Sequence, residues 1–351
     1  MRHRNTCLSI LCLSLLFFLY LSYIKHSAND NLVYLPNIGY IGREEELLDL
    51  RNFNYILKGK PCERNITHVQ IVTSYSGNVE ARSAIRRAYP SSDLNRLGIS
   101  RVFLLATLPP FHEVSQNALV DENKKYSDLV QGNFVESYRN LTYKHLMGLK
   151  WATKYCKNVK FVIKTDDDIL VDLYSLLDII ENKKFQLMGY VLKDMRPIRV
   201  KANKWYVTRN EYPDENYPSF LSGWMYVVTL EAVKKLLSHA RDFNYFWIDD
   251  LFVTGMVSQK SNVTLSDISE LFTVHPEVTE CCMRKGLKCD FIVSPDGGDH
   301  SLQLTFQKHV RHCYVNSCPT LKPGTKIEDK CVAKRKLPPL RKGFPKITVV
   351  Q

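Results

Sequence analysis

The sequence predicts an α/β fold whose central sheet is mostly parallel and is covered by helices on both faces. Between residues 68 and 181, short apolar segments rich in β-branched residues alternate with longer segments of helical periodicity. The chain has 351 residues, of which 45% are hydrophobic and 24% are charged, and this composition is sufficient for a full core. Ligands of such sheets bind at the carboxyl ends of the strands.

The apolar segments predict the strands, and the amphipathic segments between them predict the helices. Strands are expected at 68–74, 101–106, 129–134 and 161–163, and helices at 79–89, 136–156 and 173–181. From residue 193 the pattern becomes irregular, with a short strand at 205–208, before a strand at 223–229 and a helix at 230–239. From residue 280 the chain is rich in cysteine and is expected to be loop-like.

The N-terminal residues predict a membrane anchor and a stem. Arg2 and Arg4 precede the uncharged, apolar segment 6–24, which is just long enough to span a bilayer. The positive-inside rule then leaves residues 1–5 in the cytosol and the rest of the chain in the lumen, as in a single-pass type II protein. Residues 25–60 are expected to form a stem with one helix at 44–57.

The cysteines and glycosylation sequons agree with a lumenal body. Eight cysteines follow the anchor, and an even number suits up to four disulfides in an oxidising compartment. A zinc site in the cluster from Cys281 to Cys331 is the alternative, although that cluster contains no C-x-x-C pair. Three N-x-T sequons begin at Asn65, Asn140 and Asn262.

The formal net charge of +12 lies almost wholly on the lumenal body. A lumenal location excludes nucleic acid, so nucleotide phosphates, acidic glycans or lipid headgroups are the anionic partners to expect. A generally basic surface without a partner is the alternative. The tail at 334–351 is basic and contains prolines, which is typical of an exposed segment.

Three consecutive carboxylates, Asp166, Asp167 and Asp168, directly follow an apolar strand segment. Such groups repel one another unless a cation lies between them, and a hard divalent cation can share its oxygen ligands with phosphate. The alternative is that Asp168 or Asp172 caps the next helix.

A second acidic pair, Asp249 and Asp250, ends another apolar run. Sugar transfer with inversion needs a carboxylate that accepts the proton of the acceptor hydroxyl, and this pair supplies one. The alternative is that both residues complement the dipole of a helix N-terminus.

Five motifs in order along the chain carry a family resemblance. Residues 82–89 are similar to R-x-x-I-R-x-T-W, and 134–144 to the end of D-F-x-D-x-Y-x-N-L-T-x-K. Residues 164–168 match K-x-D-D-D, 217–226 are similar to Y-P-x-Y-x-x-G-x-G-Y, and 249–255 stand where E-D-V-x-x-G is expected. From about Val69 to Met256 the chain resembles the β-1,3-galactosyltransferase and β-1,3-N-acetylglucosaminyltransferase family (glycosyltransferase family 31), which consists of type II membrane enzymes of the Golgi.

The resemblance implies a GT-A-type nucleotide-sugar-binding fold, with a lumenal catalytic domain at 61–333. The implied reaction is an inverting, metal-dependent transfer of a hexose or N-acetylhexosamine from a UDP-sugar to a glycan hydroxyl. The implied linkage is β-1,3, and the implied acceptor is a glycoprotein or glycolipid.

The resemblance also assigns site residues. It implies that Asp168, with Asp166, holds Mn²⁺ or Mg²⁺ on the diphosphate, and that Asp250 is the general base. The residues implied near the nucleotide, phosphates or donor sugar are Arg82, Arg86, Lys144, Asp166 and Asp167. Without the resemblance, both arginines are also typical of a solvated helix face, and Lys144 is typical of a helix surface.

Departures from the family motifs leave a second hypothesis open. Ala88 and Tyr89 replace Thr-Trp, Met225 replaces a glycine, and Asp249 replaces a glutamate. Met225 adds bulk where backbone and ligand approach closely. The alternative is therefore an inactive or lectin-like relative that binds glycans or assists another transferase.

Overall fold

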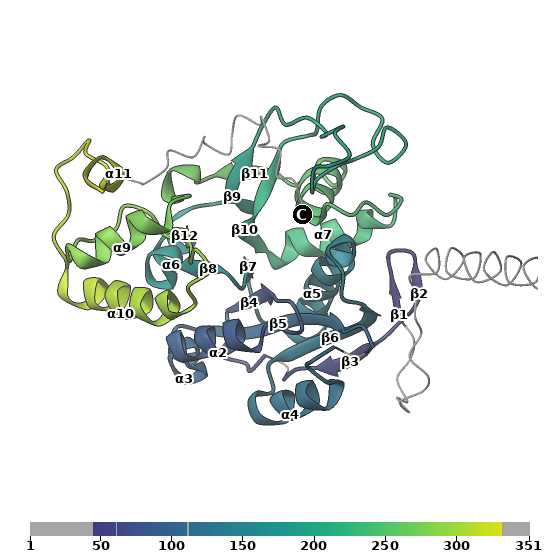
Figure 1. Cartoon of the computed structure of the whole chain (residues 1–351), viewed down its shortest axis with the longest axis horizontal. Helices are drawn as coiled ribbons and strands as arrows, with labels where there is room; N and C mark the ends of the chain where they lie inside the picture. The colour runs from purple at the N-terminus through teal and green to yellow at the C-terminus, as the bar shows by residue number, and fades with distance from the viewer. Residues whose placement is uncertain (1–44, 61, 111, 332–351) are drawn as a thin grey trace, which may run out of the picture.

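The computed structural model describes residues 45–60, 62–110 and 112–331, and an eight-stranded sheet lies at the centre of this part of the chain (Figure 1). The strand order is β11-β9-β10-β7-β4-β5-β6-β3. The strands are β3 (Tyr55–Lys58), β4 (His68–Thr73), β5 (Ile99–Thr107), β6 (Leu129–Val135), β7 (Phe161–Asp166), β9 (Leu187–Leu192), β10 (Phe220–Thr229) and β11 (Leu265–Asp267).

Helices connect most of these strands. The α-helices are α2 (Val79–Ala88), α3 (Ser91–Arg96), α4 (Gln116–Tyr126), α5 (Leu141–Tyr155), α6 (Leu173–Asn182), α7 (Leu230–Ala240), α8 (Ser258–Lys260), α9 (Pro276–Arg284), α10 (Ser301–Asn316) and α11 (Ile327–Lys330). Two 3₁₀ turns, η1 (Tyr138–Asn140) and η3 (Ser269–Leu271), and one π-helix, η2 (Leu251–Val257), complete the helical elements of the described residues. The helix expected at 136–156 is therefore divided into η1 and α5, while the others in the first half begin and end close to their predicted bounds.

Apolar side chains of β5 point alternately to the two faces of the sheet, which explains why helices cover both faces. Phe103 and Leu105 pack in one apolar cluster with residues of α2 and α4. Val102 and Leu104 point to the opposite face and pack in the main core, to which α5 contributes Leu146, Met147 and Trp151. The predicted cover of helices on both faces is confirmed.

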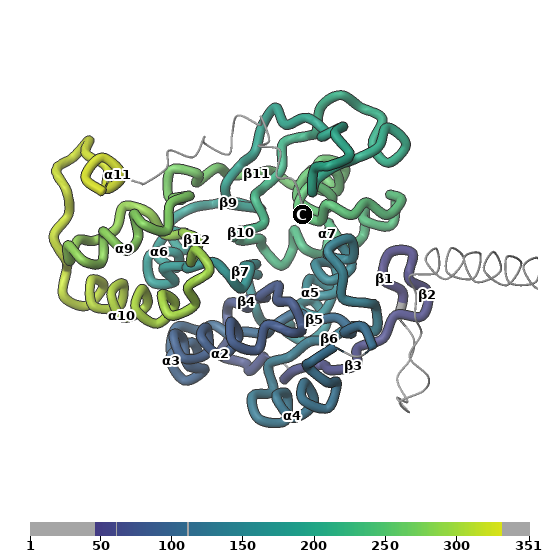
Figure 2. The backbone as a smooth tube through the Cα atoms, viewed as in Figure 1, coloured from purple at the N-terminus to yellow at the C-terminus, as the bar shows by residue number. Residues whose placement is uncertain are grey.

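The sheet is mixed, whereas the sequence predicts a mostly parallel one. Strands β7, β4, β5 and β6 are parallel, but β10 runs antiparallel to both β7 and β9, and β3 runs antiparallel to β6. No helix lies between β9 and β10, so the chain returns without the helical crossover that a parallel neighbour needs. Figure 2 shows the connection as the long teal-green loops at the top of the molecule. The strand expected at 205–208 is wrong, since this loop holds only an isolated bridge between Ile198 and Tyr206.

The helix expected at 44–57 is also wrong. These residues form β1 (Glu45–Leu47), β2 (Leu50–Phe53) and β3, and β3 is the edge strand next to β6. Phe53, Tyr55 and Leu57 are buried at alternate positions, which is the period of a strand and not of a helix. The folded domain thus includes residues 45–58, within the segment assigned to the stem. The anchor predicted at 6–24 and the tail predicted at 334–351 lie outside the described residues. Among the residues that are described, no helix is long and apolar enough to cross a membrane.

The segment after residue 276 is more regular than its cysteine content predicts. Helices α9 and α10 pack on each other, and α10 also packs on α2 and α6 (Figure 1). Strand β12 (Val293–Pro295) pairs with β8 (Ile169–Val171), which directly follows the three aspartates. A separate apolar cluster, to which Leu170, Val278 and Phe306 belong, holds these elements together.

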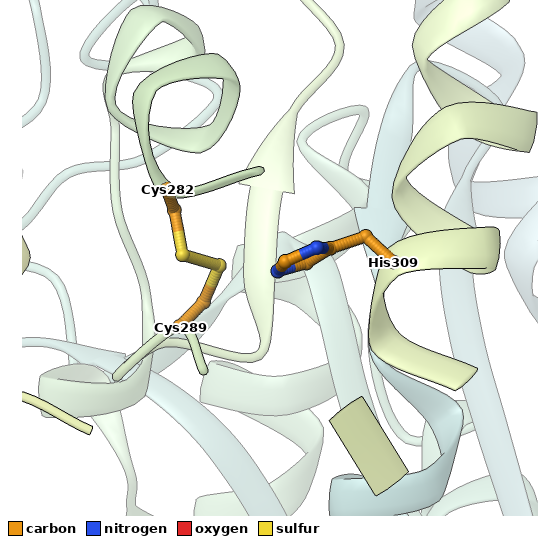
Figure 3. A group of neighbouring side chains, drawn as sticks. All are labelled: Cys282, Cys289 and His309. Atoms are coloured by element: carbon orange, nitrogen blue, oxygen red, sulfur yellow. A yellow bond between two sulfur atoms is a disulfide. The ribbon is translucent and has the colours of Figure 1, made fainter. Parts of the chain in front are cut away.

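The eight cysteines form disulfides, as the even number predicts. The pairs are Cys62–Cys156, Cys281–Cys331, Cys282–Cys289 and Cys313–Cys318. Figure 3 shows the imidazole of His309 directed toward the Cys282–Cys289 disulfide. A disulfide has no thiolate left to bind a metal, so the zinc alternative is wrong for this cluster.

Removal of the Cys62–Cys156 disulfide should destabilise the protein more than removal of Cys313–Cys318. The first joins residues 94 positions apart and the second residues only 5 apart, so the first restricts the unfolded chain more. The Cys62→Ala/Cys156→Ala variant should lose about 2–3 kcal/mol more than the Cys313→Ala/Cys318→Ala variant. Denaturant unfolding of both double variants measures this difference, and equal losses would contradict it.

Candidate active site

The three aspartates lie at the centre of the sheet's carboxyl edge. Asp166 is the last residue of β7, which lies between β10 and β4, and Asp167 and Asp168 link it to β8. Asp172 caps α6, since its carboxylate accepts the backbone N–H groups of Tyr174 and Ser175 at 3.1 Å. The capping alternative therefore holds for Asp172, whereas Asp168 lies ahead of β8.

Lys164 joins the two acidic groups that the sequence singles out. It lies two residues before Asp166 on β7, so both side chains point to the same face of the sheet. The Lys164 Nζ lies 2.7 Å from Asp166 Oδ1, 3.9 Å from Asp250 Oδ1 and 2.5 Å from the carbonyl oxygen of Gly223. Burial opposes the charge, but Asp166, Asp250 and Asp249 together raise the pKa of Lys164. The lysine therefore stays protonated between the two carboxylates.

Asp250 lies at the start of the π-helix η2 and faces β10. Its side chain is 26% exposed, but Oδ1 is buried and has no hydrogen-bond partner. A Cβ atom on Gly223 would lie 2.2 Å from Asp250 Oδ2 and 2.3 Å from Oδ1, so only glycine leaves room for this carboxylate. Burial, and next the charge of Asp249, raise the pKa of Asp250 well above its ordinary value, while Lys164 opposes the shift. Asp250 has the properties of a proton acceptor.

A buried hydrogen-bond network fixes the residue next to Asp250. His145 Nδ1 donates to Asp249 Oδ2 at 2.9 Å, and the hydroxyl of Tyr226 donates to His145 Nε2. Burial lowers the pKa of His145, which suits a neutral imidazole that uses one nitrogen as donor and the other as acceptor. His145, Asp249 and Asp250 offer ligand atoms within 4.8 Å of one another. Because both imidazole nitrogens are already used, this network is a support for Asp249 and not a metal site.

Arg82 and Lys144 both hold the loop between β4 and α2. Arg82 donates to Ser74 Oγ, to the carbonyl oxygens of Tyr75 and Ser76, and to the Glu122 carboxylate. Lys144 Nζ donates to the Ser74 carbonyl oxygen at 2.7 Å and to Glu136 Oε1 at 2.5 Å. Both side chains are fully buried, so both act on the loop from inside the domain.

Asp167 contacts the same loop from the side of the sheet edge. Its Oδ2 accepts hydrogen bonds from Ser74 Oγ at 2.7 Å and from Asn78 Nδ2 at 3.2 Å. Through Ser74, the loop that Arg82 and Lys144 hold is joined to the strand-end aspartates. Arg82, Lys144 and Asp167 are therefore joined in one hydrogen-bond arrangement through the loop.

Arg86 shares the Glu122 carboxylate with Arg82 but, within the described residues, bonds neither the β4–α2 loop nor the strand-end aspartates. Its guanidinium pairs with both oxygens of Asp128, at 2.9 and 2.7 Å, and with Glu122 Oε1 at 2.7 Å. It also lies over the rings of Phe103 and Tyr126. Arg86 thus packs on two aromatic rings and pairs with Asp128 and Glu122. In the described part of the chain, no contact joins it to the strand-end aspartates 166–168.

The C-terminal segment adds two residues that sequence reasoning missed. The backbone N–H of Asp296 donates to the Asp168 carbonyl oxygen at 2.9 Å. The buried Asp296 carboxylate accepts from His300 Nδ1 at 2.7 Å. Burial, the neighbouring Asp167 and then Asp296 raise the pKa of Asp168. The only sequence signal for Asp296 and His300 is their spacing of four in a Gly-rich segment, which is weak by itself.

Comparison with known proteins agrees with this arrangement. The family model described as Galactosyltransferase matches residues 80–269, which include both acidic groups. The chain belongs to the galactosyltransferase family. The family resemblance stated from the motifs is confirmed. Arg82 and the π-helix after Asp250 lie within the matched residues, whereas the loop that Arg82 holds, between β4 and α2, lies just before them.

Relatives of this galactosyltransferase-family chain include two β-1,3-galactosyltransferases. It is 30% identical to β-1,3-galactosyltransferase 2 of Homo sapiens over 210 residues, which cover 58% of this chain and 50% of that protein. It is 28% identical to β-1,3-galactosyltransferase 5 of Mus musculus over 260 residues, which cover 72% of this chain and 82% of that protein. The match thus spans only half the length of the first relative.

Likeness to solved structures is weaker. One example is a Drosophila β-1,4-galactosyltransferase 7 mutant in complex with manganese, UDP-Gal and xylobiose. It has 11% sequence identity and a TM-score of 0.29, and the match covers 57% of this chain and 65% of that one.

Replacement of Arg86 should destabilise the fold without affecting nucleotide binding. Arg86→Met leaves the buried Asp128 and Glu122 carboxylates with less compensation, so the free energy of unfolding should fall by about 3–5 kcal/mol. Arg87→Met is the matched control, because the exposed Arg87 side chain bonds only Ser83 within the part of the chain that the structure describes, and its loss should cost about 0.5 kcal/mol or less. Denaturant unfolding and UDP titration test both variants. A variant that unfolds normally but loses UDP affinity would make Arg86 a ligand contact.

A side chain at position 223 should displace Asp250. Gly223→Ala places a methyl group against the carboxylate and should cost about 1–3 kcal/mol of stability through overpacking. In an Asp250→Ala background the same change should cost much less, because the clashing oxygens are absent. A double-mutant cycle by denaturant unfolding measures the coupling, and additive losses would show that the two residues do not compete for space.

Proposed function

We propose that this chain is an inverting hexosyltransferase that moves a hexose or N-acetylhexosamine from a UDP-sugar to a glycan hydroxyl in β-1,3 linkage. The observation that carries the proposal is that the Lys164 ammonium lies between two carboxylates, Asp250 and the strand-end Asp166. The Asp250 Oδ1 atom is buried and has no hydrogen-bond partner among the described residues. One carboxylate is thereby available to accept a proton beside a second acidic group that suits a phosphate-bound cation.

The proposed step uses Asp250 as the general base. As the acceptor hydroxyl oxygen attacks the anomeric carbon, its proton passes to the Asp250 carboxylate, and the bond from that carbon to the phosphate oxygen breaks to release UDP. The raised pKa of Asp250 suits proton acceptance in this step. Lys164 and Gly223 keep the carboxylate in position, and the His145–Asp249 hydrogen bond holds the start of η2.

The strand-end carboxylates fit a divalent cation. Asp166 and Asp168 present oxygen atoms, which hard cations prefer, and burial together with neighbouring aspartates raises the pKa of Asp166 to about 7 despite Lys164. A cation among these groups would relieve that repulsion. We propose that Asp168 and Asp166 hold Mn²⁺ or Mg²⁺, which when bound would neutralise the charge that develops on the departing diphosphate. Asp167 and the loop braced by Arg82 and Lys144 would then border the nucleotide.

The departures that favour an inactive relative lie in the core. Met225 has 0% exposure in β10 and Ala88 has 1% exposure in α2, and both belong to the main apolar cluster. Neither side chain adds bulk to an open ligand site. This observation favours the catalytic proposal over a lectin-like relative.

We further propose the location expected from the sequence: a Golgi membrane, with a single-pass type II anchor at 6–24 and the catalytic domain in the lumen. The disulfides of the described domain support an oxidising compartment. The GT-A assignment is also part of this proposal, since the mixed sheet and the family are compatible with it.

Two conservative substitutions should separate the roles of the carboxylates. Asp168→Asn should weaken metal-dependent UDP binding, whereas Asp250→Asn should bind UDP normally and lower kcat at least about 100-fold, because it cannot accept the proton. Calorimetric titration with UDP, with Mn²⁺ or with EDTA, and product mass spectrometry with UDP-galactose, UDP-N-acetylglucosamine and UDP-N-acetylgalactosamine measure the two effects on the full-length chain.

Asp178→Asn is the control, since this exposed α6 residue lies away from the site and should leave both readouts unchanged. Full transfer by Asp250→Asn would disprove its role as base. UDP binding that EDTA does not weaken would disprove the metal.

A further inference from the structure

An exposed aromatic pair lies on the loop side of the candidate site. Tyr138 is 43% exposed and Trp205 is 42% exposed, although they are 67 residues apart in the sequence. The Trp205 indole N–H donates to the Tyr138 hydroxyl at 2.9 Å. The Lys204 ammonium lies 4.2 Å from the centre of the Tyr138 ring and 5.6 Å from that of Trp205. We call these three residues the aromatic–lysine patch.

The patch adjoins the proposed base. The Tyr138 ring packs on Trp247 with 6.0 Å between ring centres, and Trp247 precedes Asp249 by two residues. The charges of Asp249, Asp250 and Asp166 act on the Tyr138 hydroxyl and, after burial, contribute to raising its pKa to about 12. A saccharide that stacks on the patch would therefore lie within reach of the Asp250 carboxylate.

The two segments that carry the patch, η1 and the β9–β10 loop, are fixed to each other and to the rest of the domain. Arg139 pairs with Glu211 at 3.0 Å and lies over the Trp247 ring at 4.6 Å. Arg199 donates to the carbonyl oxygens of Val207, Tyr212 and Asp214. An exposed aromatic pair whose two supporting segments, η1 for Tyr138 and the β9–β10 loop for Trp205, are tied in this way is pre-organised.

A second observation points to a ligand. The indole N–H of Trp247, a residue only 4% exposed, has no hydrogen-bond partner within the described residues. A buried donor without a partner costs free energy, and such groups are concentrated at functional sites. The indole that packs against the Tyr138 ring thus keeps an unused donor.

The position of Lys204, more than the net charge of its loop, indicates which saccharide fits. The loop at 193–219 contains six basic residues and four acidic ones, Asp194, Glu211, Asp214 and Glu215, so its positive excess is small. Apolar faces of sugar rings stack on aromatic side chains whatever their charge, so the aromatic pair alone would suffice for a neutral sugar. A lysine placed against both rings adds a partner for a carboxylate or sulfate on the stacked sugar.

We infer that the aromatic–lysine patch is the acceptor subsite and that it takes an anionic saccharide, which carries a carboxylate or a sulfate next to the sugar that receives the hexose. This inference rests on the proposed function. It adds the substrate class, which neither the family nor the motifs specify. Trp205 and Tyr138 supply the stacking surface, and Lys204 selects the charge.

The test compares matched acceptors on the full-length chain. The probes are a neutral β-galactoside disaccharide, its uronic-acid counterpart and its sulfate ester, each with the donor that gives turnover. The anionic acceptors should be preferred in kcat/KM, and Lys204→Gln should reduce that preference about tenfold, through KM and not kcat. The preference should also fall as ionic strength rises. The two anionic probes separate carboxylate from sulfate recognition.

Two further variants complete the design. Trp205→Ala should raise KM for all three acceptors several-fold and leave UDP affinity unchanged, because it removes stacking only. Lys201→Gln is the control, since Lys201 is exposed on the same loop and no ring contact is found for it in the described part of the chain. Equal use of neutral and anionic acceptors, or an unchanged preference in Lys204→Gln, would overturn the inference while the transferase proposal stands.

Direct titration of the three saccharides into the chain with UDP and Mn²⁺ provides a readout that does not need turnover. If no acceptor is glycosylated, the proposed function fails, and the titration still decides whether the patch binds anionic saccharides. Tighter binding of the anionic pair that depends on Lys204 supports the subsite, and equal binding of all three rejects it.

Discussion

The rest of the site depends on the ion pairs that the Lys164 ammonium group makes with Asp166 and Asp250. The ammonium group contacts Asp166 on its own strand, the carbonyl of Gly223 on β10, and Asp250 at the start of η2. These three segments are far apart in the sequence, and two of them bring carboxylates that would otherwise repel each other. A buried charge of this kind is costly unless it is paired, so the lysine and the two aspartates stabilise one arrangement jointly. The small residue at 223 is part of the same constraint.

Around that centre, charged residues divide into those that shape the site and those open to a ligand. Arg82 and Lys144 are fully buried and donate hydrogen bonds to backbone carbonyls of the β4–α2 loop. Asp168 and His300 keep exposed surface. Arg82 on α2 and Lys144 on α5 therefore act on the site through backbone carbonyls, and the positive net charge of the chain does not show which basic residues are open to a ligand.

Much of the fold and the centre of the site could be predicted from the sequence, because the signals are local. Short apolar segments predicted strands β4 to β7, and the acidic residues at the end of β7 and before η2 predicted where the site lies. The direction of β10 could not be predicted, since it depends on how a loop without helix returns to the sheet. A helix was predicted where residues 45–58 form strands β1 to β3, because a short alternating strand and a short amphipathic helix have similar compositions. The ion pairs of Arg86 could not be predicted from the sequence, because its partners, Glu122 and Asp128, lie far from α2 along the chain.

The contact between Asp296 and the Asp168 backbone has a consequence for biosynthesis. The strand-end aspartates are made about halfway along the chain, but the segment that fixes Asp168 comes much later and lies among three disulfides between Cys281 and Cys331. The contact to Asp168 can therefore form only after the chain has been synthesised beyond Asp296. Two of the three disulfides in this segment need cysteines that are made later still.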